Sequence, residues 1–253
     1  MDTPEQTDAP QVIVTFRIPG RWDGPEDFAG SLPSGCGLEE GTLTLEDGVA
    51  ATIIPAAPDD EFAALFEASC RRPPPPAEMQ AVRDYTVNII LRCVVGSPKT
   101  ASDAMRAAAT VVDAGGGGVF IDNCGLAHSA SDWLMMAEDA TLDAITFAYV
   151  GMIADAGDVT TLGMHIFGRP DFIMTERDAG EGLEGELDPI IQVMQYLVAT
   201  DREVDVGHVI AGEDGSGFRI AAAEPAPMTA GSSMHNPFGR WRLISLRDIA
   251  ASN

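Results

Sequence analysis

The chain has 253 residues, of which 45% are hydrophobic, and it carries 15 Lys and Arg against 39 Asp and Glu. This length suffices for one large domain or two small ones with a substantial core, but a net charge of −24 repels phosphate backbones and anionic membrane surfaces. Composition and charge therefore disfavour a nucleic-acid-binding or membrane-surface protein. They are compatible with a basic protein partner, or simply with solubility.

The beginning of the chain, "MDTPEQTDAP", is polar and acidic. It lacks the basic and apolar regions of a secretory signal, and no apolar run approaches 18 residues. We therefore expect residues 1–10 to be a disordered tail and the protein to be cytoplasmic. The four cysteines are scattered, which favours reduced and mostly buried thiols.

The first part of the chain predicts a small α+β unit over residues 11–72. Alternating hydrophobic residues in "QVIVTFR" indicate a strand over 11–17. Pro25, followed by two acids, is typical of the first turn of a short helix. A hairpin is expected over 41–55, because strand-like alternation flanks the Asp-Gly turn at 47–48.

A helix and a proline run end this unit. Phe62, Leu65 and Phe66 have the i, i+3, i+4 spacing of a buried helical stripe. The four prolines at 73–76 favour an extended conformation, because proline cannot continue a helix or a sheet. They mark the expected boundary with a main α+β domain over 77–253. A single continuous domain is the alternative.

Strands and helices are interleaved in the rest of the chain. The predicted strands span 85–96, 118–123, 144–154, 159–168, 205–212, 216–224 and 239–249. The predicted helices lie in 97–118, which ends in four glycines, in 129–140 and at the end of 182–201. Two pairs of strands form hairpins, which favours an α+β fold with a mixed or largely antiparallel sheet and about five helices.

The segment "DNCGLAHSASD" over 122–132 concentrates polar residues after a buried strand. Ser129 and Asp132 fit the N-cap and N3 positions of a helix, and Asn123 and Gly125 suit a turn. On this interpretation the cluster bends the backbone and starts a helix, and no residue is left that demands chemistry.

Two chemical interpretations of the same segment stay open. Cys124 at a strand end could be acidified by the following helix and, with His128, form a nucleophilic pair in a hydrolase. His165 is a further candidate for such a pocket. A zinc site would need four ligands, and neither C-x2-C nor H-x3-H occurs. We therefore expect no metal and no cofactor, and whether the protein is an enzyme stays undecided.

Candidate binding residues lie in the second half of the chain. A Gly-Arg-Pro-Asp turn precedes an acidic stretch over 171–188, which is either a solvated loop or a docking surface for a basic partner. Residues 215–253 hold four Arg and two acids, a small basic island that could bind an anion. The candidate binding residues are Arg169, Asp171, His235, Arg240 and Arg242.

One resemblance covers roughly residues 40–222. The stretch "AHSASDWLMMAED", the piece "TTLGMHIFGRPD", the helix "LDPIIQVMQYLVA" and the piece "DVGHVIAG" follow one another in this order. In this the chain resembles a bacterial family catalogued as domain of unknown function 4261. The resemblance implies a compact α+β domain, and it carries no catalytic residues to transfer.

The leading hypothesis from the sequence is a non-catalytic, cytoplasmic protein-binding or regulatory module with an acidic surface. A hydrolase-type enzyme with a Cys/His pocket is the alternative. Binding of an anion by the basic C-terminal island is a third hypothesis.

Overall fold

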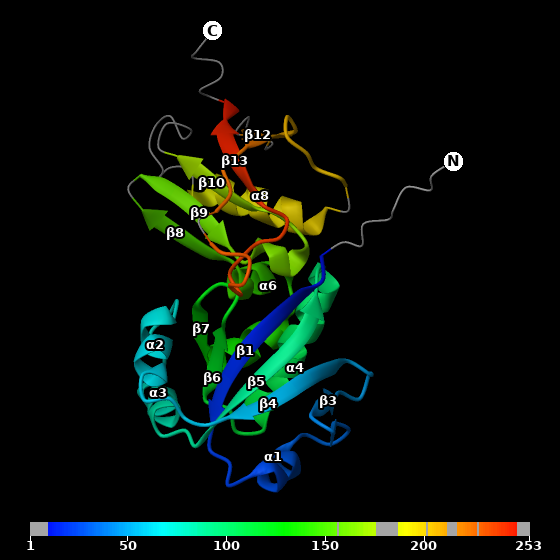
Figure 1. The fold of residues 1–253 in the computed structure, drawn as a ribbon, viewed down its shortest axis with the longest axis vertical. Coiled ribbons are helices and arrows are strands. Elements are labelled where there is room, and N and C mark those ends of the chain that lie inside the picture. Colours follow the sequence, from blue (N-terminus) through cyan, green and yellow to red (C-terminus); the bar gives the residue numbers. More distant parts are fainter. Residues whose placement is uncertain are drawn as a thin grey trace, which may run out of the picture.

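The fold consists of two sheets with helices packed around them. A computed structural model describes residues 10–155, 157–175, 187–200, 202–211, 217–226 and 228–246. Over these ranges it contains seven α-helices, one 3-10 helix, and sheets of seven and six strands. Figure 1 shows a lower lobe built on the first sheet and an upper lobe built on the second, joined at a narrow waist. The predicted α+β class is confirmed, with two sheets instead of one.

The first sheet is antiparallel throughout, and its centre is formed by β1 and β5. These strands pair along nine residues, from Val12 opposite Val95 to Gly20 opposite Val87. In the order of pairing, the strands are β2 (Gly37–Glu39), β3 (Thr42–Thr44), β4 (Ala50–Ala56), β5 (Val87–Val95), β1 (Val12–Gly20), β6 (Gly118–Ile121) and β7 (Leu126–Ser129).

Helices α4 (Pro98–Asp113) and α5 (Ala130–Asp139), both predicted from the sequence, pack together against this sheet. The alternation of β1 points every second side chain toward them, and Phe16 is fully buried there. Phe16 packs against Trp133 of α5 with ring centroids 5.7 Å apart. The predicted first strand, the hairpin around the Asp-Gly turn and the long strand before α4 are all present.

Helices α2 (Phe62–Ser69) and α3 (Pro76–Arg83) form a separate small core with the β6–β7 hairpin. Phe62 and Phe66 are buried, but the Leu65 side chain is 48% exposed. The predicted stripe is therefore wrong at Leu65, because α2 buries only a narrow face. The short helix α1 (Pro25–Ser31) begins at Pro25 as predicted and lies at the lower end of the molecule (Figure 1).

The prolines at 73–76 do not separate two sheets. Strand β4 lies before them and β5 after them, and the two strands pair in the first sheet. Arg71, beside the prolines, donates a hydrogen bond to the carbonyl of Val150, and its guanidinium lies 4.6 Å from the centre of the Phe147 ring. Pro73, Pro74 and Pro75 thus belong to a connection within the lower lobe, since the segments on both sides contribute strands to one sheet. The predicted extended conformation is wrong at Pro76, which is the first residue of α3.

The polar segment over 122–132 forms the turn and second strand of a hairpin. Strand β7 was not predicted, and it pairs with β6 around Gly125, whose φ is 67°. Ser129 caps α5 as predicted, because its hydroxyl accepts a hydrogen bond of 3.3 Å from the backbone N–H of Asp132.

The second sheet is mixed. Strands β10 and β13 are parallel, and its other neighbouring strands are antiparallel. In the order of pairing, the strands are β11 (Val209–Ala211), β12 (Gly217–Ala222), β13 (Arg240–Ser245), β10 (Asp171–Thr175), β9 (Asp158–Leu162) and β8 (Gly151–Asp155). Helix α8 (Leu187–Ala199) is present as predicted, and its inward side chains from Ile190 onward are buried.

Two predicted strands of this region are wrong in part. Residues 144–154 form the end of helix α6 (Leu142–Tyr149) and then β8. Periodicity could not distinguish a buried helix from a buried strand here, because α6 is apolar on most sides. Residues 159–168 form β9 and then the 3-10 helix η1 (Met164–Phe167), since Gly163 with φ 108° turns the chain between them.

Parts of two predicted loops lie outside the described residues. Most of the acidic stretch 171–188 lies outside the described residues, and the first residues of this stretch form strand β10. The tip of the β11–β12 hairpin, 212–216, also lies outside them. No helix in the described ranges is long and apolar enough to span a membrane.

Candidate functional site

The predicted nucleophile Cys124 is buried with 6% exposure. Burial raises the pKa of its thiol to about 12, although nearby Arg71 and a backbone hydrogen bond act in the opposite direction. Reactive thiols need the thiolate, which this environment disfavours. Cys124 lies beside the start of η1, because a Cβ placed on Gly163 would be 3.3 Å from the Cβ of Cys124.

His128 is buried in a different environment. Its ring lies near those of Trp133 and Phe147, and its Nε2 donates a hydrogen bond of 3.0 Å to the carbonyl of Ala148. Burial lowers its pKa to about 4, so the ring is neutral at physiological pH. No hydrogen bond joins Cys124 and His128 within the described part of the chain. The arrangement therefore does not provide an activated thiol.

We expect alkylation with iodoacetamide at pH 7.5 to label Cys36 first. Cys36 is half-buried at a surface groove, whereas burial raises the pKa of Cys70 to about 11 and that of Cys93 and Cys124 to about 12. Native Cys124 should react on the order of 100-fold more slowly than Cys36, as measured by peptide mass spectrometry. The urea-unfolded protein, with all four thiols exposed, is the control. Fastest labelling at Cys124 in the native protein would restore the nucleophile hypothesis.

His165 lies in η1 at the waist and takes part in a network around Asn123. The Asn123 side-chain oxygen accepts from the backbone N–H of Thr15 at 2.9 Å, and its Nδ2 donates to the carbonyl of Ile13 at 3.0 Å. Nδ2 also lies 3.0 Å from Nε2 of His165 and 3.3 Å from the carbonyl of Ser233. Burial lowers the His165 pKa to about 4. The network joins β1, η1 and the segment before β13.

Asp171 is held in a second buried network, at the start of β10. Its carboxylate accepts hydrogen bonds from the Thr161 hydroxyl at 3.2 Å, the Met164 backbone N–H at 3.2 Å and the Asn236 side-chain amide at 2.8 Å. Burial outweighs these bonds and raises the pKa of Asp171 to about 6. Asp171 is only 4% exposed, so the hydrogen bonds of its carboxylate stabilise the fold.

The structure brings four of the five predicted binding residues around this network. The carbonyl of Arg169 accepts a hydrogen bond from the side chain of Asn236, and His235 precedes Asn236 in the chain. The backbone of Arg240 in β13 lies opposite that of Asp171 in β10. Arg242 lies two residues farther along β13. The guanidinium of Arg169 donates to the carbonyl of Thr200, and that of Arg240 donates to the carbonyl of Glu224 at 2.9 and 3.1 Å. Both cations are thus engaged in fixing loops of the upper lobe.

A groove of about 660 Å³ lies on the lower lobe between the β3–β4 turn, α4 and α5. Its apolar surface comes from Leu45, Ala109, Leu134 and Ala137, which are buried or half-buried. Its charged lining residues are Glu46, Asp47, Asp113, Glu138 and Arg106. Four carboxylates against one guanidinium give this lining a net charge of −3.

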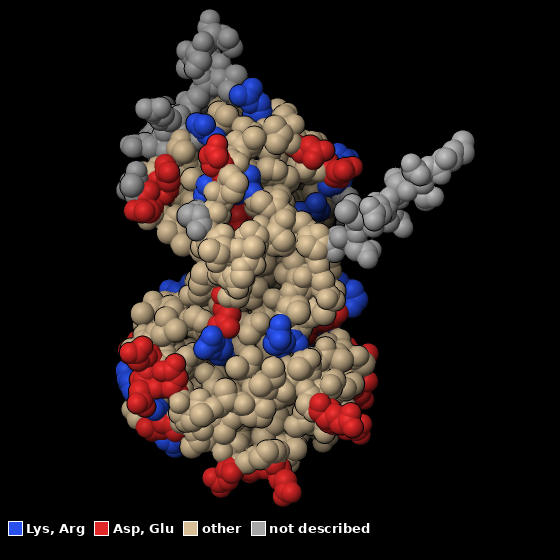
Figure 2. All heavy atoms as spheres, viewed as in Figure 1, with Lys and Arg blue, Asp and Glu red and all other residues tan. Residues whose placement is uncertain are grey.

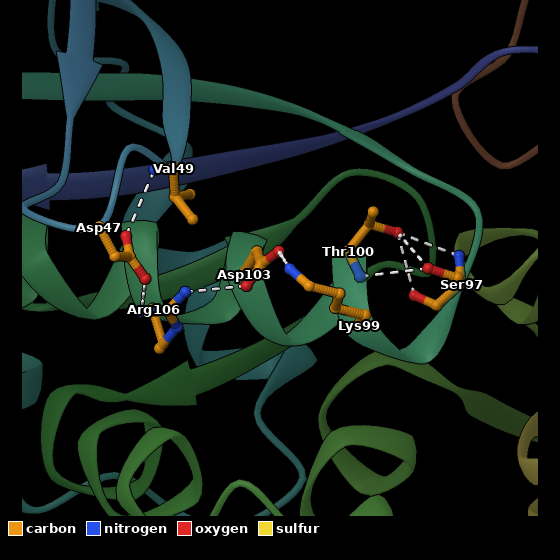
Figure 3. A network of polar contacts seen from close by, with 7 residues as sticks. All are labelled: Asp47, Val49, Ser97, Lys99, Thr100, Asp103 and Arg106. Atoms are coloured by element: carbon orange, nitrogen blue, oxygen red, sulfur yellow. Dashed lines mark hydrogen bonds and ion pairs between the residues drawn. The ribbon is translucent and has the colours of Figure 1, made fainter.

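Arg106 is fixed between Asp47 of the groove and Asp103, which lies one helical turn before it in α4 (Figure 3). It donates to Asp47 at 2.7 Å and to Asp103 at 2.8 Å, and Asp103 also accepts from Lys99 at 2.6 Å. The hydrogen bond from Arg106 lowers the pKa of Asp47, and the bonds from Lys99 and Arg106 together lower that of Asp103 despite its partial burial. The network therefore holds the β3–β4 turn against α4.

The first turn of α4 is fixed as well. Ser97 and Thr100 form a capping box, in which the Thr100 N–H donates to the Ser97 hydroxyl at 3.2 Å and the Ser97 N–H donates to the Thr100 hydroxyl at 3.0 Å (Figure 3). This capping box stabilises the N-terminus of α4, and the pairing of Arg106 with Asp47 joins this helix to the β3–β4 turn, so these two walls of the groove are preformed.

The remaining acids of the groove are available for a ligand. Glu46, Asp113 and Glu138 are exposed, and their side chains make no hydrogen bond or ion pair to any described residue. Together with the apolar surface between them they suit a Lys or Arg side chain, which carries an apolar stem and a cationic head. Sequence reasoning missed this groove, because its residues come from three distant segments.

A search for metal-binding clusters and comparisons with known proteins gave no further indication of function. The described residues contain no cluster of three or more His, Cys, Asp or Glu able to hold a metal ion. Comparisons of the sequence with protein-family models and curated proteins, and of the fold with solved structures, gave no match. The family resemblance noted in the sequence stays a prediction.

Proposed function

We propose that the protein is a non-catalytic, cytoplasmic protein-binding module whose groove on the lower lobe receives a basic segment of a partner protein. The observation that carries the proposal is the set of three available carboxylates, Glu46, Asp113 and Glu138, around a preformed apolar floor. Charge complementarity of this kind gives specificity and fast association.

The whole-molecule charge supports the same proposal. A net charge of −24 attracts a basic partner over long distances, and salt weakens this attraction. Acidic side chains are visible at the edges and the lower end of the lower lobe in Figure 2. The groove adds local selection to this general attraction, because its apolar floor favours a segment that alternates Lys with Leu.

The experiment compares two triple variants of equal net charge. In the groove variant, Glu46→Gln, Asp113→Asn and Glu138→Gln remove the available carboxylates. The control removes carboxylates that are exposed and unpaired among the described residues, by Asp60→Asn, Glu203→Gln and Glu224→Gln. Fluorescence anisotropy measures the binding of a labelled peptide of alternating Lys and Leu at 0.15 M salt.

We expect the groove variant to bind this peptide about tenfold more weakly than the control, because each exposed ion pair contributes on the order of 0.2–1 kcal/mol. The wild type should bind more tightly than both. Equal affinities of the two variants would show that only the overall charge attracts the peptide, and the proposed groove would be rejected.

A further inference from the structure

A second pocket, of about 260 Å³, lies at the lower end of the molecule between α1, the β2–β3 hairpin and strands β4 and β5. The described residues that line it carry only apolar side chains or are Gly. The larger lining side chains are those of Trp22, Phe28, Leu38, Ile53, Val87 and Ile89. This pocket shares no residue with the groove of the proposed function.

The walls of the pocket are held in place by a hydrogen bond, a ring contact and the pairing of two strands. The indole N–H of Trp22 donates to the carbonyl of Ala114 at 2.8 Å, and the Trp22 ring meets that of Phe28 edge-on with centroids 5.0 Å apart. Ile53 and Ile89 are buried side chains of paired strands. The apolar space is thus preformed, so a ligand would not have to order it.

The pocket selects by charge as well as by polarity. No described residue places a charged side chain in its lining, so an ionic group inside would lose its hydration without compensation. Several neighbouring residues are acidic and exposed: Asp23 just before α1, Glu26 and Asp27 in its first turn, Glu39 at the end of β2 and Glu40 after it. The neighbouring cation Arg21 is paired with Asp84. Their carboxylates repel an anionic group at the surface.

The volume limits the ligand further. It exceeds the roughly 150 Å³ of an apolar cavity that binds benzene, and it falls below the roughly 300–1,000 Å³ of sites for drug-sized ligands. We propose that this pocket binds a free small molecule through one aromatic ring or one short alkyl chain, and that the molecule carries no negative charge.

An NMR titration tests the proposal. The indole N–H of Trp22 reports on the pocket in a ¹H–¹⁵N spectrum, and hexan-1-ol and hexanoate serve as probes with the same alkyl length and different charge. We expect saturable shifts with hexan-1-ol and at least tenfold weaker binding of hexanoate. Leu38→Trp and Val87→Phe fill the pocket from two different walls, and each should abolish the saturable shift.

Leu65→Trp is the matched control, because it adds the same ring on the exposed side of α2. It should bind hexan-1-ol as the wild type does. Saturable shifts that persist in both folded pocket variants, or no saturable shift in the wild type, would overturn the proposal. Equal affinity for hexanoate would overturn the proposed charge selection. All of these results are independent of peptide binding in the groove.

Discussion

Acidification should destabilise the protein through its two buried histidines. Burial lowers the pKa of His128 and of His165 to about 4, from an ordinary value of 6.5. Between these values the unfolded chain binds more protons than the folded one, so stability is full above pH 6.5 and falls as the pH decreases toward 4. Each histidine accounts for a loss of about 3 kcal/mol over this range.

Asp171 acts in the opposite direction. Its pKa is raised from 3.8 to about 6, so the folded protein binds the extra proton between these values, and stability from this group is lost as the pH rises through 6. The shift amounts to about 3 kcal/mol and offsets one histidine. We therefore expect a net loss of about 3 kcal/mol from these three groups on going from pH 7 to pH 4.

Urea unfolding of His165→Gln at several pH values measures the histidine contribution. Whatever its stability at pH 7, this variant should lose about 3 kcal/mol less on acidification than the wild type, because one buried proton acceptor is gone. His208→Gln removes an exposed imidazole and serves as control. If both variants follow the wild-type pH dependence, the predicted role of His165 is wrong.

Gly163→Ala should be one of the most destabilising single substitutions in the chain. Gly163 has φ 108°, and a Cβ there would lie 2.1 Å from the carbonyl oxygen of Tyr149. The left-handed backbone costs about 1–3 kcal/mol for a residue with a side chain, and the overlap with backbone adds to it. We expect a total loss above about 4 kcal/mol in the free energy of unfolding.

Gly207→Ala separates the two causes. Gly207 has a similar φ of 96°, but no atom of a described residue lies within 4 Å of a Cβ at that position. This variant should lose only about 1–3 kcal/mol, the cost of the backbone conformation alone. Chemical unfolding measures both variants. Equal losses in the free energy of unfolding would show that the contact between residue 163 and Tyr149 does not contribute to the destabilisation.

Local patterns in the sequence predicted most of the lower lobe correctly. The alternation of β1, the Asp-Gly turn before β4 and the capping residue Ser129 each depend on neighbours within a few positions, so they are readable without the fold. The same holds for α8, whose apolar residues repeat at helical spacing. These features explain why the α+β class could be predicted.

The sequence predictions failed where contacts between residues distant in the chain determine the structure. Helix α6 is surrounded by other elements, so its sequence lacks a polar face that would reveal a helix. The groove also depends on packing, since Asp47 reaches Arg106 across 59 positions of the chain. The contact of the His128 ring with Phe147 and the hydrogen bond of Asp171 with Asn236 likewise join residues that are distant in sequence.

The position of β13 has a consequence for synthesis on the ribosome. This strand lies between β12 and β10, so the six-stranded sheet stays divided until residues 240–245 have left the exit tunnel. All seven strands of the other sheet precede residue 130. The nascent chain can therefore complete its first sheet early, while a premature stop before β13 would leave two strand edges open to aggregation.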